Sequence, residues 1–156
     1  MAKVKPIPDE YPRVTPYLRI KGAADAIEFY KTVLGATERG RMGGPNGTVG
    51  HAELEIGASM IMLAEEAPDM NAYAPGHFGG SPVSIHVYVD DVDAVFAAAK
   101  SSGAKTIREV EDQFYGDRAG AFEDPWGHHW SVASHVEDVP PEEMEQRAAA
   151  AMQQQA

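Results

Sequence analysis

The stretch VSIHVYV (residues 83–89) decides the fold, because the chain carries a second version of it, VTPYLRI, at residues 14–20. Both stretches alternate, with apolar residues or proline at one set of positions and polar or aromatic residues at the other. The correspondence continues downstream, where Asp25-Ala26 matches Asp93-Ala94 and Gly35-Ala36 matches Gly103-Ala104. A repeat of this length in only two copies predicts a pseudo-symmetric pair of modules rather than a solenoid.

Each copy predicts the same order of elements: one strand, one helix and three more strands. Apolar residues at spacings of three and four predict helices at about 23–34 and 92–101, each preceded by one of the alternating stretches. Alternation and turn residues then predict strands at about 37–42, 51–56 and 60–63, and at about 105–110, 121–123 and 129–133. The predicted fold class is therefore α+β. We expect two βαβββ modules, at about 14–64 and 83–134, to form a curved mixed sheet around a cleft in a pseudo-two-fold arrangement.

Two segments lie outside these modules. The connection from Glu65 to Pro82 is long for a compact domain and is expected to be a linker or a functional lid. The tail, residues 136–156, breaks at Pro140-Pro141 and is expected to carry a helix from about Glu142. The sequence thus predicts one domain over residues 1–135, followed by a tail with a helix.

Composition excludes several classes of function. The net charge is −11, from 13 Lys+Arg against 24 Asp+Glu, which disfavours nucleic acid and anionic membrane surfaces as partners. The chain has no cysteine, so disulfides, thiolate metal sites and a cysteine nucleophile are excluded. No apolar run approaches the roughly 18 residues that span a bilayer, and the first residues lack the apolar stretch of a signal peptide. We expect a cytoplasmic protein.

Strand alternation divides each sheet into a helix-covered face and an opposite face that carries polar and aromatic side chains. Convergent aromatic residues with a few polar anchors are typical of small-molecule sites. We therefore predict a ligand-binding cleft, with a plain solvent-facing sheet surface as the alternative. Arg19 is expected to neutralise Glu53 or to lie near the ligand, and Trp130 is expected to belong to the core. The predicted ligand-binding residues are Tyr17, His51, Glu53, His86 and Tyr88.

Three motifs give the chain a family resemblance. AIEFYK (26–31), VDDVDA (89–94) and FEDPWG (122–127) occur in this order within the two modules. With the repeat, they resemble the vicinal-oxygen-chelate superfamily, which comprises glyoxalases, bleomycin-resistance proteins and extradiol dioxygenases. The ending DPWGHHW (124–130) is similar to a branch with a DPxGHxW pattern that is often labelled demethylubiquinone-methyltransferase-like. The resemblance implies the fold predicted above and a site for a small molecule.

The same resemblance implies a divalent metal held by the first and last strands of each module. The corresponding positions here are Thr15, Ser84, Ser131 and one residue within 60–63, MIML. A divalent ion needs carboxylate or imidazole donors, which these residues do not supply. The sequence therefore predicts neither a metal nor another cofactor. A displaced His/Glu site made by His86, His51 and Glu53 remains as the alternative.

The predicted function is metal-independent binding or sequestration of a small organic molecule, expected to be aromatic, by a homodimer. Whether the protein is an enzyme stays open from sequence. One alternative is a metal-dependent lyase, isomerase or dioxygenase that uses the displaced site. Another is a protein with a vestigial cleft, which acts through its acidic surface and C-terminal helix.

Overall fold

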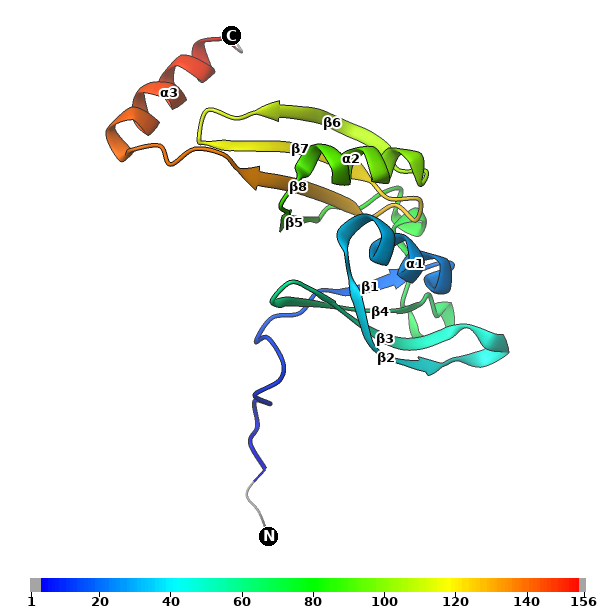
Figure 1. The fold of residues 1–156 in the computed structure, drawn as a ribbon. Coiled ribbons are helices and arrows are strands. Elements are labelled where there is room, and N and C mark those ends of the chain that lie inside the picture. Colours follow the sequence, from blue (N-terminus) through cyan, green and yellow to red (C-terminus); the bar gives the residue numbers. More distant parts are fainter. Residues whose placement is uncertain (1–3, 155–156) are drawn as a thin grey trace. The chain divides into compact units, whose positions relative to one another are not determined.

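The computed structural model describes residues 4–154, and the chain divides between Gly80 and Ser81 into two compact units (Figure 1). The first unit contains β1 (Tyr17–Ile20), α1 (Ala23–Leu34), β2 (Thr37–Gly43), β3 (Val49–Ile56) and β4 (Ser59–Glu65). The second contains β5 (Ser84–Tyr88), α2 (Val92–Ser101), β6 (Lys105–Asp112), β7 (Asp117–Glu123), β8 (His129–His135) and α3 (Pro141–Gln154).

Both units have the same sheet topology. The strand orders are β1-β4-β3-β2 and β5-β8-β7-β6. In each sheet the first strand runs parallel to the last strand of its module, and the remaining pairs are antiparallel. The predicted α+β class, with two βαβββ modules and a C-terminal helix, is confirmed. Each module builds its own four-stranded mixed sheet.

The helix of each module is bound at its N-terminus by the end of its last strand. Glu65 accepts hydrogen bonds from the backbone N–H groups of Gly22 and Ala23, at 2.7 and 3.0 Å. In the second unit, Ser134 Oγ accepts one from the backbone N–H of Val92 at 3.0 Å. Ala23 and Val92 are 69 positions apart, and so are Glu65 and Ser134. These contacts are therefore equivalent in the repeat, and they satisfy N–H groups that a helix leaves without an internal partner.

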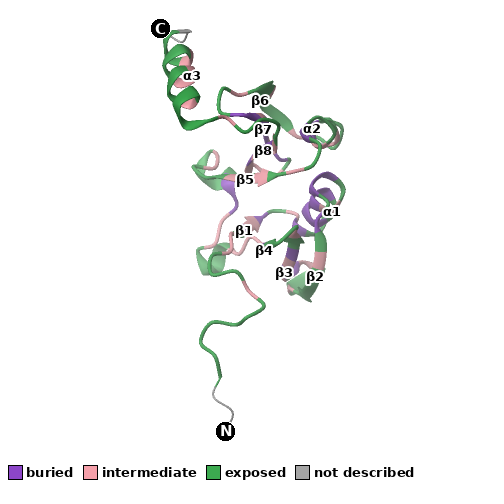
Figure 2. Ribbon diagram, turned by 60° about the vertical axis from the view of Figure 1, so that its left-hand side comes forward, coloured by how far each residue is buried: buried purple, intermediate pink, exposed green. Residues whose placement is uncertain are grey.

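The core of each unit lies between its helix and the sheet face that the helix covers. Figure 2 shows buried residues on α1 and on the strands beneath it, while α3 is mostly exposed. The alternation predicted from sequence is confirmed on these faces. The buried residues on the helix-covered faces include Leu18, Ile20, Ala52, Leu54, Phe122, Trp130 and Val132.

Two strand starts differ by three or more residues from the prediction. Val14 and Val83 belong to the alternating stretches, but they are 84% and 63% exposed, and β1 begins only at Tyr17. Pro16 precedes it and has no N–H to donate to the ladder, so only its carbonyl takes part, accepting from Met62 at 2.9 Å. The strand predicted from 121 begins at Asp117, because residues 117–120 continue the pairing with β8.

The connection between the modules is more ordered than a flexible linker. It contains two short 3-10 helices, Pro68–Met70 and Pro75–Phe78, and a bridge between Ala67 and Ala72. Tyr73 stacks on His77 with ring centres 3.8 Å apart. These local contacts all lie in the first unit.

The C-terminal tail crosses the turn between β6 and β7 before α3 begins. The carbonyl of Gly116 accepts from the backbone N–H groups of Val136 and Glu137, at 2.9 and 3.0 Å. On α3, Arg147 donates to both carboxylate oxygens of Glu137, at 2.8 and 2.7 Å, and thereby fastens the helix to the tail. None of the helices within residues 4–154 has the length and apolar character that crossing a membrane requires.

Candidate functional site

Tyr17, His51 and Glu53 lie together on the open face of the first sheet, the face that α1 does not cover. Tyr17 Oη is 2.8 Å from His51 Nδ1, and His51 Nε2 is 3.3 Å from Glu53 Oε1. A neutral imidazole has one donor and one acceptor nitrogen. Glu53 can only accept, so Nε2 carries the proton and Nδ1 accepts from the Tyr17 hydroxyl. These three predicted residues form one hydrogen-bonded chain.

Two further residues complete this cluster. Tyr11 donates from Oη to Glu53 Oε1 at 2.9 Å. Arg39 places Nε 3.8 Å from Glu53 Oε2 and its guanidinium 4.8 Å from the centre of the Tyr11 ring. We call Tyr11, Tyr17, Arg39, His51 and Glu53 the first-sheet cluster. Arg39 neutralises Glu53, and Arg19 lies over the Tyr17 ring at 4.9 Å.

These contacts set the protonation state of Glu53. Partial burial raises the pKa of the Glu53 carboxyl, but the hydrogen bonds from Tyr11 and His51 and the nearby Arg39 charge outweigh it, so the net pKa is lowered. The same hydrogen bond to Glu53 raises the pKa of the Tyr11 hydroxyl. At neutral pH Glu53 is therefore a carboxylate that accepts hydrogen bonds from Tyr11 and His51.

A β-bulge brings Arg39 to this face. Glu38 pairs with Leu54 and Gly40 with Glu53, so Arg39 is the extra residue of β2. A bulge turns side chains away from strict alternation, and its position is not visible in the periodicity of residues 37–43. A glycine inside a strand is the signal that could have located it. Tyr11 had no such signal, because it precedes the first module.

His86 and Tyr88 lie on the open face of the second sheet. Their rings pack edge to face with centres 4.9 Å apart, and His86 Nδ1 is 3.0 Å from Ser131 Oγ. Tyr88 donates to Asp117 Oδ2 at 2.7 Å. The structure thus brings together the two residues predicted for this sheet and adds Ser131 and Asp117 to them.

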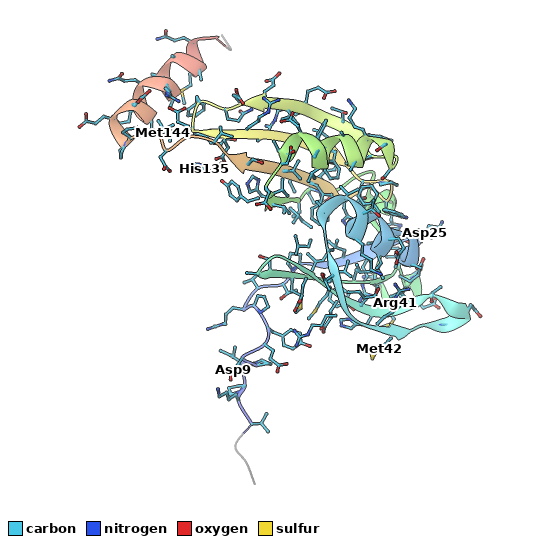
Figure 3. The ribbon with its side chains drawn as sticks, in the orientation of Figure 1. Asp9, Asp25, Arg41, Met42, His135 and Met144 are labelled. Carbon is cyan, nitrogen blue, oxygen red and sulfur yellow. The ribbon has the colours of Figure 1, made fainter. Side chains whose placement is uncertain are left out.

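Asp117 links Tyr88 to His135 at the end of β8 (Figure 3). His135 Nδ1 is 2.8 Å from Asp117 Oδ1, and its Nε2 is 2.9 Å from Asp138 Oδ1. An imidazole between two carboxylates donates from both nitrogens and is charged. The hydrogen bonds to Asp117 and then Asp138 raise the pKa of His135. Burial raises the pKa of Asp117, yet the hydrogen bonds from His135 and Tyr88 lower it overall.

The two open faces differ in chemistry at equivalent positions. The bulge of β2 recurs in β6, where Ile107 is the extra residue beside the Arg108–Ala121 pair. By this register Arg39 corresponds to Ile107 and Glu53 to Ala121. The second sheet therefore has aliphatic side chains where the first sheet has the Arg39–Glu53 ion pair. At this pair of positions, a carboxylate that could anchor a ligand is present in the first sheet and absent from the second.

The positions that would hold a divalent metal do not fit one. Tyr17 pairs with Met62 in the first sheet as His86 pairs with Ser131 in the second. Met62 is therefore the equivalent of Ser131, and it is the fourth metal-ligand position, which the sequence placed only within 60–63. A thioether and the hydroxyls of Thr15, Ser84 and Ser131 are poor donors for such an ion, and Thr15 Oγ1 instead faces the carbonyl of Pro12 at 3.5 Å. Within residues 4–154, His, Cys, Asp and Glu form no group of three or more suited to a metal ion.

The DPWGHHW stretch serves the fold. Asp124 is 1% exposed. Its Oδ1 accepts from the backbone N–H groups of Trp126 and His128, both at 3.0 Å, and its Oδ2 from Trp130 Nε1 at 2.9 Å. One carboxylate thus holds the turn between β7 and β8 and fixes the buried indole of Trp130. The prediction that Trp130 belongs to the core is confirmed.

Comparisons with known proteins agree with this fold. The sequence profile of the Glyoxalase/Bleomycin resistance protein/Dioxygenase superfamily matches residues 12–132. The uncharacterized protein Rv0887c of Mycobacterium tuberculosis is 42% identical over 137 residues, which cover 86% of this chain and 81% of that protein.

Two solved structures show the same architecture. TioX from Micromonospora sp. ML1 has a TM-score of 0.63 and 25% identity, covering 80% of this chain and 99% of its own. The fosfomycin resistance protein FosX from Listeria monocytogenes, solved with Mn(II) and sulfate, has a TM-score of 0.62 and 16% identity over 88% of this chain and 97% of its own. At that identity FosX shows the fold alone.

Proposed function

Because the chain belongs to the Glyoxalase/Bleomycin resistance protein/Dioxygenase superfamily, we propose that it binds a small organic molecule without the help of a metal ion. The observation that carries this proposal is the first-sheet cluster. Three side chains from three segments, Tyr11, Arg39 and His51, converge on one carboxylate, Glu53, whose side chain is only 14% exposed. A sheet surface that merely faces solvent has no reason to assemble such a network.

The chemistry of the open faces supports an aromatic ligand. Tyr17 and Tyr88 are 44% and 62% exposed, so their rings are available for contact. Aromatic contacts add about 0.5–1.5 kcal/mol per pair. In this proposal Tyr17 provides apolar contact on the first sheet, where His51 and Glu53 fix the orientation of a ligand by hydrogen bonds. On the open face of the second sheet His86 and Tyr88 provide apolar contact.

Metal independence is supported by the donor set. Met62, Ser84 and Ser131 stand where the resemblance places metal ligands, and none offers a carboxylate or an imidazole. We therefore propose ligand binding or sequestration, with the protein acting as a cytoplasmic homodimer. The mechanism is then equilibrium binding, in which affinity depends on the contacts of the open faces.

The test is a thermal-shift screen of planar aromatic compounds, because a ligand stabilises the folded state by mass action. We expect at least one compound to raise the Tm of the wild type. Its affinity should fall about tenfold, or 1.4 kcal/mol, in Glu53→Gln. Glu55→Gln is the matched control, since it makes the same change two residues along β3. Equal affinity in wild type and both variants would remove Glu53 from the site.

Elemental analysis of the purified protein tests metal independence separately. We expect far less than one Zn, Ni, Fe or Mn per chain. A content of about one metal per chain that disappears in His86→Ala would contradict the proposal. That result would favour a metal-dependent lyase, isomerase or dioxygenase with a displaced His/Glu site.

A further inference from the structure

The N-terminal segment, residues 4–16, contains no helix or strand and places one aromatic ring in the first-sheet cluster. Figure 3 shows this segment, which carries Asp9, running away from the sheet. Before the chain reaches Pro16, the residue that precedes β1, the side chains that hold this segment to the first unit are Glu53 and Arg39. Tyr11 donates to Glu53, and Arg39 donates to the carbonyl and to the carboxylate of Glu10, both at 3.0 Å.

We propose that Tyr11 is an internal occupant of the ligand site on the first sheet, and that the ligand it stands in for is a phenol or another aromatic compound with a hydroxyl group. This inference rests on the proposed function and deepens it, because it names the chemical class of the ligand. The phenol class follows from the side chain of Tyr11, which is itself a phenol and donates to Glu53.

Three features of the contact define that class. The Glu53 carboxylate accepts from a phenolic hydroxyl at 2.9 Å, so a ligand needs a donor at this point. The guanidinium of Arg39 lies 4.8 Å from the ring centre, within the range of a cation–π contact. His51 already donates to the same Glu53 oxygen. An anionic group at the position of the Tyr11 hydroxyl has no hydrogen to donate to Glu53 and would be repelled by that carboxylate, so the site disfavours carboxylate ligands at this point.

The segment is held weakly enough to be displaced. The Glu10 side chain is 78% exposed, and exposed ion pairs contribute little to stability. At the end of the segment the carbonyl of Pro16 accepts from the backbone N–H of Met62 and joins it to β4. The other hydrogen bonds, between Lys5 and Asp9, Tyr11 and Pro8, and Thr15 and Pro12, lie within the segment. A free phenol at sufficient concentration can therefore take the place of Tyr11 without disturbing the sheet.

The experiment removes the Tyr11 side chain by substitution and supplies the same phenol group as a free small molecule. The probe is 4-methylphenol, which has the atoms of a tyrosine side chain, with toluene as the probe that lacks the hydroxyl. We expect 4-methylphenol to bind Tyr11→Ala at least tenfold more tightly than the wild type, measured by calorimetry and thermal shift. Toluene should show no comparable gain.

Two variants check where the probe binds. Tyr115→Ala removes a tyrosine from the second unit, where its ring packs on Phe114, and should not improve binding. Adding Glu53→Gln to Tyr11→Ala should abolish the gain. If Tyr11→Ala does not fold, Tyr11→Phe keeps the ring, removes the donor, and should still bind 4-methylphenol more tightly than wild type.

Equal binding of 4-methylphenol to wild type and to Tyr11→Ala would overturn the inference, and so would equal gains for toluene. The proposed function has its own readout in the pair Glu53→Gln and Glu55→Gln. If that pair behaves as expected while Tyr11→Ala gains nothing, only the inference about Tyr11 fails. If neither the Glu53→Gln comparison nor the 4-methylphenol experiment shows a role for Glu53, both the inference about Tyr11 and the proposed function fail.

Discussion

Trp130 and Tyr88 occupy opposite faces of the second sheet, so alanine substitutions at the two positions separate packing from binding. Trp130 is fully buried and donates to Asp124. Trp130→Ala should lower the free energy of unfolding by about 3–5 kcal/mol, because it opens a core cavity. Tyr88→Ala should cost about 1 kcal/mol, from the lost hydrogen bond to Asp117, and should weaken ligand binding. Urea unfolding measures the loss of stability in each variant.

Trp126→Ala is the control for Trp130→Ala, because it changes the same residue type at a half-buried position in the turn that precedes β8. Its cost should be clearly smaller. If Tyr88→Ala unfolds the protein while Trp130→Ala loses only ligand binding, the two faces of the sheet have been assigned the wrong way round.

The His135 contacts predict a dependence of stability on pH. The raised pKa of His135 means that its contribution is fully present below the unfolded pKa of about 6.5 and is lost as pH rises through the folded value. The lowered pKa of Asp117 gives a contribution that is lost as pH falls below about 3.8 through its folded value. The free energy of unfolding should therefore decline from pH 6 to pH 9.

Denaturant unfolding at pH 6 and pH 9 measures this decline, and His135→Gln should flatten it. His77→Gln is the control, because His77 stacks on Tyr73 and should leave the slope unchanged. A slope that persists in His135→Gln would assign the pH dependence to other groups.

At single residues, alternation was a sufficient guide where strands are regular. Tyr17, His51 and Glu53 were predicted on one face, and the structure joins them by hydrogen bonds. Arg39 could not be predicted, because a bulge interrupts the two-residue period of β2 just at that position. Tyr11 could not be predicted either, since a segment without regular structure has no periodicity from which to infer a neighbour.

At the scale of elements, the tail that precedes α3 depends on the absence of a side chain at Gly116. A Cβ there would lie 2.1 Å from the carbonyl oxygen of Glu137, and the φ angle is +96°. Gly57 has φ +58° with no atom within 4 Å of such a Cβ. Gly57→Ala should cost about 1–2 kcal/mol from backbone strain alone. Gly116→Ala should add about 1–3 kcal/mol from the steric clash.

Denaturant unfolding gives the two costs, and hydrogen exchange locates the difference. In Gly116→Ala the amides of Val136 and Glu137 should lose protection, because both donate to the Gly116 carbonyl. Equal stability of the two variants would mean that the tail moves aside at no cost.

The helices were predictable from end to end, whereas several strand ends were not. Apolar spacing placed α1 and α2 at the bounds that the structure shows, and Asp91 caps α2 by accepting from the N–H of Ala94 at 3.0 Å. A helix carries its own stop signals, such as Gly35 with φ +64°. A strand ends where its partner ends, and the partner of β1 is β4, some forty positions later in the chain. The start of β1 at Tyr17 was therefore not visible locally.

For the whole molecule, the prediction concerns assembly. Superfamily membership and the two exposed open-face tyrosines support a homodimer, in which a second chain supplies a wall for the ligand. Light scattering should then give twice the chain mass of 16.8 kDa. A mass of one chain over a wide range of protein concentration would contradict the dimer. The matched measurement on Tyr11→Ala shows whether the N-terminal segment affects association.

The contact between Glu65 and the start of α1 has a consequence for protein synthesis. The carboxylate that receives the N–H of Gly22 follows it by 43 positions. At 5–20 residues per second, a ribosome needs roughly 2–9 s to add them. During that interval α1 has been synthesised without its cap, and β1 has no parallel neighbour. The first half of the chain can mature only after Glu65 has been added, and Glu65 is added before any strand of the second half, because β5 begins at Ser84.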